Sequence, residues 1–221
     1  MQWSPYNYVL RNPFVMIDPD GRQIDVKDYL QNEPNAKADI QNIITEFQFF
    51  TGYKFELNEN TNIIEKKGVI PGQKYSETAR ERVDLYYQRM HYMHYSTTGC
   101  RGEFEGDRND IEIDPVQIKE FIDGGNKLPR YTQSWGLTLF HELEHNETGK
   151  DDPNIFQFGT IGYNEKTVNE IRKEMDLPLR YSYTSRNGII PFDALSKSKL
   201  DNWETPPINS MFIDINKINK K

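Results

Sequence analysis

The feature that most constrains this chain is the HExxH sequence of residues 141–145, in which His141 and His145 stand four residues apart. The apolar residues around it recur at helical spacing, and Gly149 follows where a helix cap is expected. This pattern predicts a helix from Thr132 or Ser134 to Gly149. Because residues four apart share one helix face, both imidazoles are expected to point toward one place.

Two such histidines suggest a metal site. Imidazole is a preferred zinc ligand, and two histidines with a third protein ligand leave one tetrahedral position open for water. Glu142 lies beside the pair and is expected to take a proton from that water as it attacks a peptide carbonyl, and to return it to the leaving amine. The sequence therefore predicts Zn2+ as cofactor, with His141 and His145 as ligands and Glu142 as catalytic acid and base. At pH values under about 6.5, where imidazoles protonate, the affinity for zinc is expected to decrease.

The third ligand has two candidates. Glu165, twenty residues after the second histidine, has a spacing similar to that of thermolysin-like gluzincins and is favoured, although an acid in the first turn of a helix needs no metal to explain it. Asn169, one turn later, is expected to orient a ligand imidazole. The rival is Asp151, which an HExxHxxGxxD pattern of metzincin type would use; here Thr148 stands at the glycine position and Gly149 comes one residue late.

Other residues are candidates for contacts with a substrate. An oxyanion donor is expected downstream of the HExxH sequence, with Tyr183 preferred and Tyr163, Arg180 and Tyr181 as alternatives. The segment Ile111–Ile113 alternates apolar and polar residues and predicts a strand. It is either an edge strand that pairs with an extended substrate or an ordinary strand of a sheet.

Hydrophobic spacing predicts further elements along the chain. We expect helices over residues 35–51, 76–94, 115–121 and 164–175, and strands over 53–57, 62–65 and 110–114. On the second helix, His91 and His94 are expected to pack rather than to bind metal. The chain beyond Tyr183 is expected to be irregular. These elements predict an α+β fold class, mostly helical with a small β-sheet.

Composition argues against two classes of function. The chain has 221 residues, and 27 Lys and Arg against 34 Asp and Glu give a formal charge of −7, which disfavours broad binding to nucleic acid. No stretch reaches the ~18 apolar residues of a membrane-spanning helix, and the first twenty residues lack the apolar stretch of a signal peptide. The single cysteine, Cys100, cannot form an internal disulfide and is expected to be structural.

The beginning of the chain resembles a bacterial segment. The runs Tyr6–Phe14 and Ile17–Arg22 look like the closing segment of the Rhs-repeat-associated core, which precedes variable C-terminal toxins in polymorphic toxin proteins. The resemblance implies that residues 1–22 are the end of that core or a linker, and that residues 23–221 are the toxin domain. It also implies delivery into a target cell as the C-terminal part of a larger bacterial protein, with an immunity protein as partner.

A second resemblance covers roughly residues 76–183. Besides the HExxH sequence it rests on Ser96–Gly99, Ile111–Asp114, Gly159–Gly162 and above all Asn169–Tyr183. These segments are similar to the M91 family of effector metallopeptidases, zinc endopeptidases that some pathogens inject into host cells. The resemblance implies a zincin-like metallopeptidase fold, with the two motif histidines as zinc ligands and Glu142 as acid and base.

Together these inferences predict a zinc-dependent endopeptidase that acts as a secreted toxin or effector. Its partners would be a protein substrate and an immunity protein, and we expect a monomer that neither binds nucleic acid nor inserts into a membrane. Two rival functions are a degenerate peptidase that binds only zinc and a protein partner, and a toxin with another hydrolase activity, such as a nuclease. The intact Glu142 argues against the first, and the acidic charge argues against the second.

Overall fold

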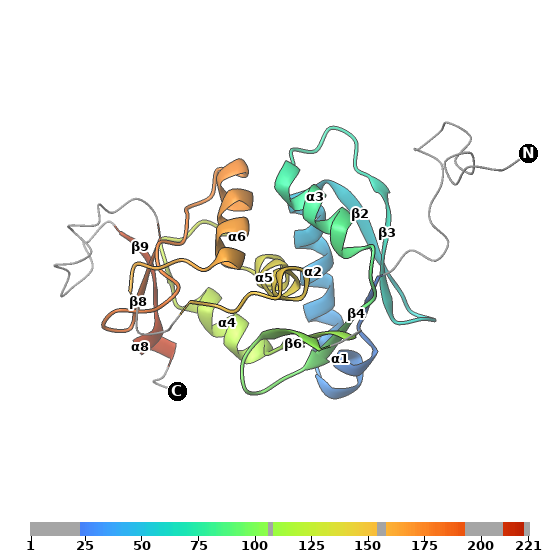
Figure 1. Ribbon diagram of the computed structural model, residues 1–221, viewed down its shortest axis with the longest axis horizontal. Helices are drawn as coiled ribbons and strands as arrows, with labels where there is room; N and C mark the ends of the chain where they lie inside the picture. The colour runs from blue at the N-terminus through green and yellow to red at the C-terminus, as the bar shows by residue number, and fades with distance from the viewer. Residues whose placement is uncertain (1–22, 106–107, 154–157, 193–209, 219–221) are drawn as a thin grey trace, which may run out of the picture.

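The computed structural model describes residues 23–105, 108–153, 158–192 and 210–218, so the predicted core end or linker at residues 1–22 lies outside the described part of the chain. The described part is a mixed α+β fold, which confirms the predicted α+β class, but its main sheet has six strands and is larger than the small sheet predicted (Figure 1). Within it, no helix combines the length and the apolar character that crossing a membrane requires.

The larger sheet has six strands in the order β2-β3-β1-β4-β6-β5. They are β1 (Ile24–Asp25), β2 (Tyr53–Asn58), β3 (Ile63–Val69), β4 (His91–Tyr95), β5 (Arg101–Glu105) and β6 (Arg108–Ile113). β4 pairs in parallel with both β1 and β6, whereas the other pairs are antiparallel. The strand at the edge beside β6 is therefore β5.

Helices α1, α2 and α5 pack against this sheet, and a second, three-stranded sheet lies at the other end of the described fold. The helices are α1 (Lys27–Asn32), α2 (Ala36–Thr51), α3 (Glu77–Tyr86), α4 (Pro115–Asp123), α5 (Trp135–Thr148), α6 (Tyr163–Glu174) and α8 (Ile215–Ile218). The small sheet has the order β7-β9-β8, from β7 (Gly125–Asn126), β9 (Met211–Asp214) and β8 (Ile189–Phe192). Figure 1 shows α5 at the centre, with α2 and the large sheet on one side and α4, α6 and the small sheet on the other.

Aromatic packing fixes α5 at this central position. Phe140 of α5 packs against Phe47 and Phe50 of α2, with ring centroids 4.6 and 6.3 Å apart, and against Tyr86 of α3 at 6.1 Å. All four side chains are completely buried. Aromatic rings bury the largest apolar areas of any side chains, so this cluster holds the helix that carries the HExxH sequence rigidly in the core.

Most predicted helices are confirmed, with one shifted start. α5 begins at Trp135, after the N-cap residue Ser134, whose hydroxyl accepts a hydrogen bond from the N–H of Leu137 (3.4 Å). The sequence predicted that the next helix starts at Asn164, but α6 begins at Tyr163, directly after Gly162. Asn164 lies inside the helix, where its side chain turns toward α5 instead of capping.

The helix predicted over residues 76–94 is wrong in its second half. α3 ends at Tyr86, and β4 follows between β1 and β6. His91 and Met93 of β4 are buried while Tyr92 is exposed, as expected for a strand with one covered face. The spacing of Met90 and Met93 continues that of α3, but pairing with two neighbouring strands outweighs this local pattern.

The structure decides between the two alternatives for one predicted strand and corrects the prediction for the tail of the chain. Residues 110–114 contain the predicted strand, but β6 is hydrogen-bonded to β4 on one side and to β5 on the other. With both edges occupied, Ile111–Ile113 cannot add a substrate strand. The tail beyond Tyr183 is not wholly irregular, because β8 and β9 pair with each other there. Residues 193–209 of that tail lie outside the described residues.

His91 makes the stability of this fold depend on pH. Its side chain is completely buried, its Nε2 lies 3.1 Å from the carbonyl oxygen of Tyr86, and burial lowers its pKa to about 4. The unfolded chain takes up the same proton near pH 6.5. The contribution of His91 to the free energy of unfolding is therefore expected to be complete above pH 6.5. It is expected to decrease progressively as the pH falls toward 4.

Denaturant titrations at pH 7 and pH 5 measure this loss. Other acidic groups also titrate, so the comparison is with His91→Gln, which keeps a side-chain donor for Tyr86 but has no proton to gain. The variant is expected to lose less stability than the wild type between the two pH values. Equal losses would mean that the His91 imidazole does not contribute.

Candidate metal centre

The helix that carries the HExxH sequence is held at both of its ends. At the start, the carboxylate of Glu46 accepts a hydrogen bond from the backbone N–H of Gly136. At the end, Gly149 adopts the left-handed conformation (φ 60°), and its N–H donates to the carbonyl oxygen of His145. A glycine accepts this conformation without steric cost, so the chain reverses sharply after α5 and runs back along it.

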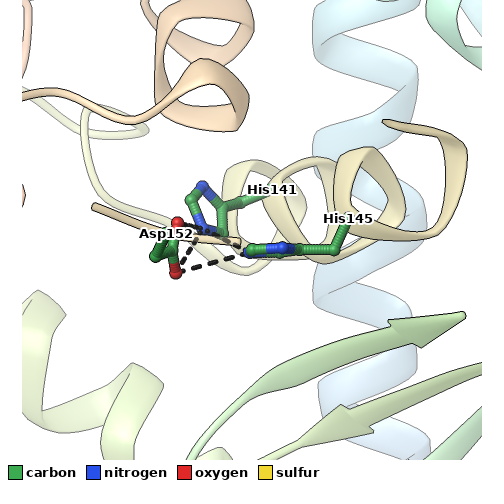
Figure 2. A group of neighbouring side chains, drawn as sticks. All are labelled: His141, His145 and Asp152. Carbon is green, nitrogen blue, oxygen red and sulfur yellow. Dashed lines mark hydrogen bonds and ion pairs between the residues drawn. The ribbon is translucent and has the colours of Figure 1, made fainter. Parts of the chain in front are cut away.

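This reversal places an aspartate beside the two histidines (Figure 2). The Nε2 atoms of His141 and His145 are 3.2 Å apart, and Asp152 lies 3.1 Å from the first through Oδ1 and 3.4 Å from the second through Oδ2. One ligand atom from each residue falls within 4.8 Å of the others. We call these three residues the His–His–Asp cluster.

The Nδ1 atom of each imidazole in the cluster faces an oxygen atom of the chain. His145 Nδ1 lies 2.8 Å from the carbonyl oxygen of Lys150, and Asn164 donates to the same carbonyl at 2.9 Å. His141 Nδ1 lies 3.4 Å from Glu165 Oε2. With oxygen atoms near both Nδ1 atoms, a neutral ring of either histidine would carry its hydrogen on Nδ1 and direct its Nε2 lone pair into the cluster. This arrangement is typical of histidines that bind a metal.

Asp152 was not among the residues that the sequence singled out. The rival candidate, Asp151, is exposed at the surface, one residue short of the cluster. The position of Gly149 could have indicated Asp152. Both the glycine and this aspartate lie one residue later than in the HExxHxxGxxD spacing, so the distance between them along the chain is the same.

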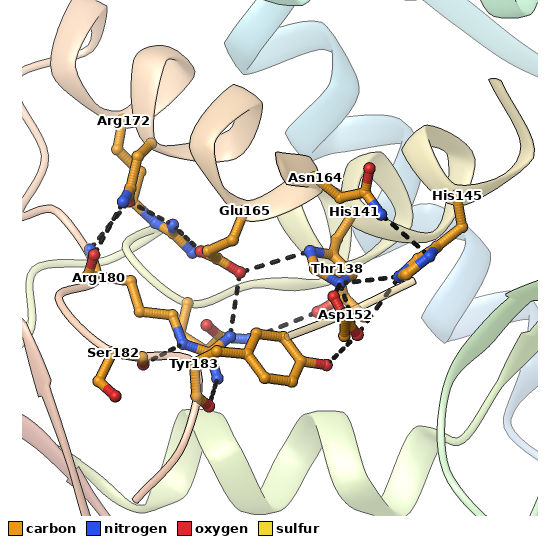
Figure 3. Close-up of polar contacts among 12 residues, drawn as sticks. Thr138, His141, His145, Asp152, Asn164, Glu165, Arg172, Arg180, Ser182 and Tyr183 are labelled. Atoms are coloured by element: carbon orange, nitrogen blue, oxygen red, sulfur yellow. Dashed lines mark hydrogen bonds and ion pairs between the residues drawn. The ribbon is translucent and has the colours of Figure 1, made fainter. Parts of the chain in front are cut away.

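Glu165, favoured by the sequence as third ligand, does not lie beside the two Nε2 atoms. Arg172 and Arg180 both donate to its carboxylate, Arg180 at 3.1 Å (Figure 3). Burial alone would raise the pKa of Glu165, but the two guanidinium groups outweigh burial and hold the pKa well below its usual range. Glu165 is thus an ionised acceptor behind His141, and this geometry does not fit the predicted role as third ligand.

Asn169 also differs from its predicted role. Its side-chain amide donates to the carbonyl oxygen of Arg180 (2.8 Å), and its oxygen accepts from the Arg180 backbone (2.9 Å) and from Arg172 (2.9 Å). It therefore holds the two arginines and contacts neither imidazole. The amide that approaches a motif histidine is that of Asn164, 3.0 Å from His145 Nδ1; the sequence had suggested only a helix cap there.

Among the four candidate oxyanion donors, Tyr183 is the one whose side chain reaches the cluster. Its hydroxyl donates to Asp152 Oδ2, and its ring stacks on His141 with centroids 5.8 Å apart (Figure 3). Arg180 uses Nε and Nη2 for the carbonyl oxygens of Ser182 and Tyr183, besides its bond to Glu165. Tyr163 is half exposed beneath the ammonium group of Lys150.

The histidines and the aspartate of the cluster shift each other's pKa values. Burial would lower the pKa of His141, but hydrogen bonds and charge from Asp152 and Glu165 outweigh it and raise this pKa to about 10. The pKa of Asp152 is held below its usual range, because the two histidines outweigh the effect of burial. These shifts favour a protonated imidazole in the cluster when no cation is bound, so protons are expected to compete with a metal at a higher pH than the 6.5 expected from the sequence.

Glu142 lies next to a cavity. The carboxyl group is buried, and burial raises its pKa despite the nearby histidines. The cavity has a volume of about 260 Å³, and His141 and Glu142 contribute to its lining. Its apolar walls include Phe121 of α4, Ile190 of β8 and Ile215 of α8. This volume exceeds the about 150 Å³ that holds a benzene molecule, so a large side chain can enter beside Glu142.

Comparison of the chain with protein-family models, with curated proteins and with solved structures found no match.

Proposed function

We propose that this chain is a zinc-dependent endopeptidase in which His141, His145 and Asp152 hold the metal and Glu142 transfers the proton. The observation that carries the proposal is the convergence of two Nε2 atoms and one carboxylate beside a buried glutamate that lines a cavity. Three protein donors leave the open position that catalytic zinc sites need.

The donor set suits zinc better than the common alkaline-earth ions. Calcium and magnesium prefer oxygen donors, whereas two imidazoles with one carboxylate match zinc and related transition metals. Among the described residues, the buried Asp152 Oδ1 accepts no hydrogen bond, and His141 Nε2 is the polar atom close to it. In the same part of the chain, the polar contacts of the two Nε2 atoms are with each other and with the carboxylate of Asp152. A single cation would satisfy all three groups.

A bound zinc ion would supply Lewis-acid chemistry, polarising the scissile carbonyl and bringing the pKa of water down toward ~7. The carboxylate of Glu142 would accept a proton from the water that attacks the carbonyl carbon. It would then donate that proton to the amine nitrogen as the carbon–nitrogen bond breaks, giving one new carboxyl and one new amino terminus. Burial, which raises the pKa of Glu142, suits a group that must both accept and release a proton.

Tyr183 and Glu165 would act around the metal ligands. Tyr183 donates to Asp152, so in this proposal its main task is to hold the third ligand; donating to an oxyanion instead would require its hydroxyl to leave Asp152. Glu165 would accept from His141 Nδ1 and fix the ring, as carboxylates behind ligand histidines do. The Lys150 carbonyl oxygen, to which the Asn164 amide also donates, would do the same for His145.

Arg180 bears on where a substrate would be cut. An exopeptidase that removes C-terminal residues needs a cation to bind the terminal carboxylate. Arg180 lines the cavity, but its Nε, Nη1 and Nη2 atoms all donate to groups of the chain itself. This use of its donors favours internal cleavage.

The biological role that we propose rests on the two resemblances in the sequence. Residues 1–22 support delivery as the C-terminal part of a larger bacterial protein, and residues 76–183 support a zincin-like effector peptidase. In this proposal the partners are a protein substrate in the target cell and an immunity protein in the producing cell.

Metal content and casein digestion test the proposed activity together. We expect about one zinc per chain, cleavage of casein at internal bonds by mass spectrometry, loss of cleavage with a chelator, and recovery when zinc is added back. Plasmid DNA in parallel tests the nuclease alternative. A chain without zinc would overturn the metal site, zinc without casein cleavage would favour a binding module, and plasmid degradation would favour a nuclease.

A further inference from the structure

A second cavity lies at the start of the HExxH helix, and none of its lining residues belongs to the His–His–Asp cluster. Its volume is about 200 Å³, more than the roughly 150 Å³ that hold a benzene molecule. Its apolar walls come from Ile122 of α4 and from Leu128 and Pro129, which precede α5. Ile122, Pro129 and Arg130 are exposed lining residues, so this second cavity opens at the surface.

A buried acid lines the second cavity. Glu46 of α2 is only 8% exposed, and its carboxylate accepts a hydrogen bond from the backbone N–H of Gly136. A β-carbon built on Gly136 would lie 2.8 Å from the β-carbon of Glu46, so glycine allows α2 and α5 to meet closely at this point. The close approach of the two helices fixes the stem of Glu46 at the wall of the second cavity.

Among the described residues, no basic side chain forms an ion pair with Glu46. Three other buried acids each have such a partner: Asp39 pairs with Lys119, Glu144 with Arg82, and Glu165 with Arg172. The hydrogen bond of Glu46 is with a neutral N–H, and the α5 dipole adds only part of a positive charge. Burial raises the pKa of Glu46, as expected for an acid without a full counter-charge. A buried charge of this kind is stabilised by a cation.

The wall opposite Glu46 is already formed. Tyr131 has a left-handed backbone (φ 72°), which a residue other than glycine adopts only when its surroundings hold it there. Its ring packs against Phe49 of α2 with centroids 4.4 Å apart, and the guanidinium of Arg130 lies 4.6 Å from the centroid of the same ring. A ligand would therefore enter a site that needs little rearrangement, which favours binding.

We propose that the second cavity binds a cationic group on an apolar stem, with Glu46 as its counter-ion. An alkylammonium ion and the side chain of a lysine or arginine share this chemistry. Gln133 lines both the second cavity and the cavity beside Glu142, so the two sites are neighbours. Under the proposed function, a basic residue of the substrate would occupy the second cavity while another residue lies beside Glu142. Binding of the cation itself does not rest on that function.

An NMR titration of the isotope-labelled full chain tests the proposal without zinc or activity. The probe is n-butylammonium at neutral pH, and n-butanol, which has the same stem and no charge, is the matched control. We expect the amide signals of Gly125 and Gly136 to shift and saturate with the amine. Butanol is expected to bind at least ~10-fold more weakly, because hydrogen bonds to charged groups are the stronger ones. Equal binding of the two probes would overturn the proposal.

Three variants locate the charge that binds the amine. Glu46→Gln keeps an oxygen for the Gly136 N–H and is expected to weaken amine binding at least ~10-fold. Arg130→Gln removes an exposed positive charge and is expected to tighten it about two-fold. Ile122→Trp keeps Glu46 but fills the cavity from an exposed position, so it should abolish binding even if Glu46→Gln does not fold. Wild-type affinity in Glu46→Gln or in Ile122→Trp would place the amine elsewhere and refute the site.

A second set of probes identifies the source of the cation. N-acetyl-lysinamide in the same titration, and casein-derived peptides before and after lysine acetylation, test a side chain of the substrate. If the substrate supplies the cation, acetylation should raise KM several-fold in the wild type and leave KM unchanged in Glu46→Gln. If butylammonium binds but the lysine probes do not, the ligand is a free amine. A chain that binds butylammonium and cleaves no peptide would refute the proposed function and leave the cation site established.

Discussion

Replacing Asp152 with asparagine is expected to lower zinc affinity by at least ~100-fold, more than the loss of a group that only supports a ligand. The substitution preserves the shape of the side chain and leaves an oxygen to accept from Tyr183. It removes the negative charge that faces both histidines. Competition with a chromophoric zinc chelator would measure the change.

Asp151→Asn is the matched control. It removes the same negative charge from the neighbouring residue, whose side chain is exposed. It is expected to leave zinc affinity within about two-fold of the wild type, since exposed charges are screened by water and salt. Equal effects of the two substitutions would show that charge alone matters. If zinc affinity is unchanged in Asp152→Asn and lost in Asp151→Asn, the third ligand is Asp151, the rival candidate from the sequence.

Replacing Glu142 with glutamine is expected to lower kcat about 1,000-fold while zinc content stays unchanged, because it removes the proton acceptor and no metal ligand. The free energy of unfolding should not fall, since burial already disfavours the ionised carboxyl group. Zinc analysis, thermal unfolding and casein-peptide kinetics on one preparation would show all three results.

Glu144→Gln offers a control inside the same motif. The Glu144 carboxylate points away from the cluster and accepts from Arg82 and from the hydroxyl of Tyr86. Loss of this buried charge is expected to lower Tm, because Arg82 loses its ion partner, while kcat per folded molecule is maintained. If Glu142→Gln retained activity and Glu144→Gln lost it, the catalytic role would have to move to the other glutamate.

Residues whose roles follow from local geometry could be predicted from the sequence. Helical spacing was sufficient to place the two motif histidines together, because four residues make about one turn. The third member of the cluster depends on how the chain turns after the helix. The glycine that makes this turn is one residue later than in the HExxHxxGxxD pattern, and so is Asp152. A pattern that requires glycine at position 148 therefore points to Asp151, which is not in the cluster.

Partners that come from distant parts of the chain could not be predicted in this way. Glu165 has the spacing of a ligand, but its final position depends on Arg172 and Arg180, whose guanidinium groups draw its carboxylate behind His141. Likewise, β4 continues a helical pattern and becomes a strand only because β1 and β6 lie on either side. Such choices are made by tertiary contacts, which outweigh local propensity when the two differ.

The order of strands in the small sheet also has a consequence for how the chain is made. β7 and β8 do not pair with each other; both pair with β9, which is synthesised last of the three. The ribosome will have released every residue of the His–His–Asp cluster well before β9 can dock and α8 can bring Ile215 to the cavity. During translation the three residues of the cluster therefore exist before the cavity wall is complete, so under the proposed function the metal could bind before the cavity has formed.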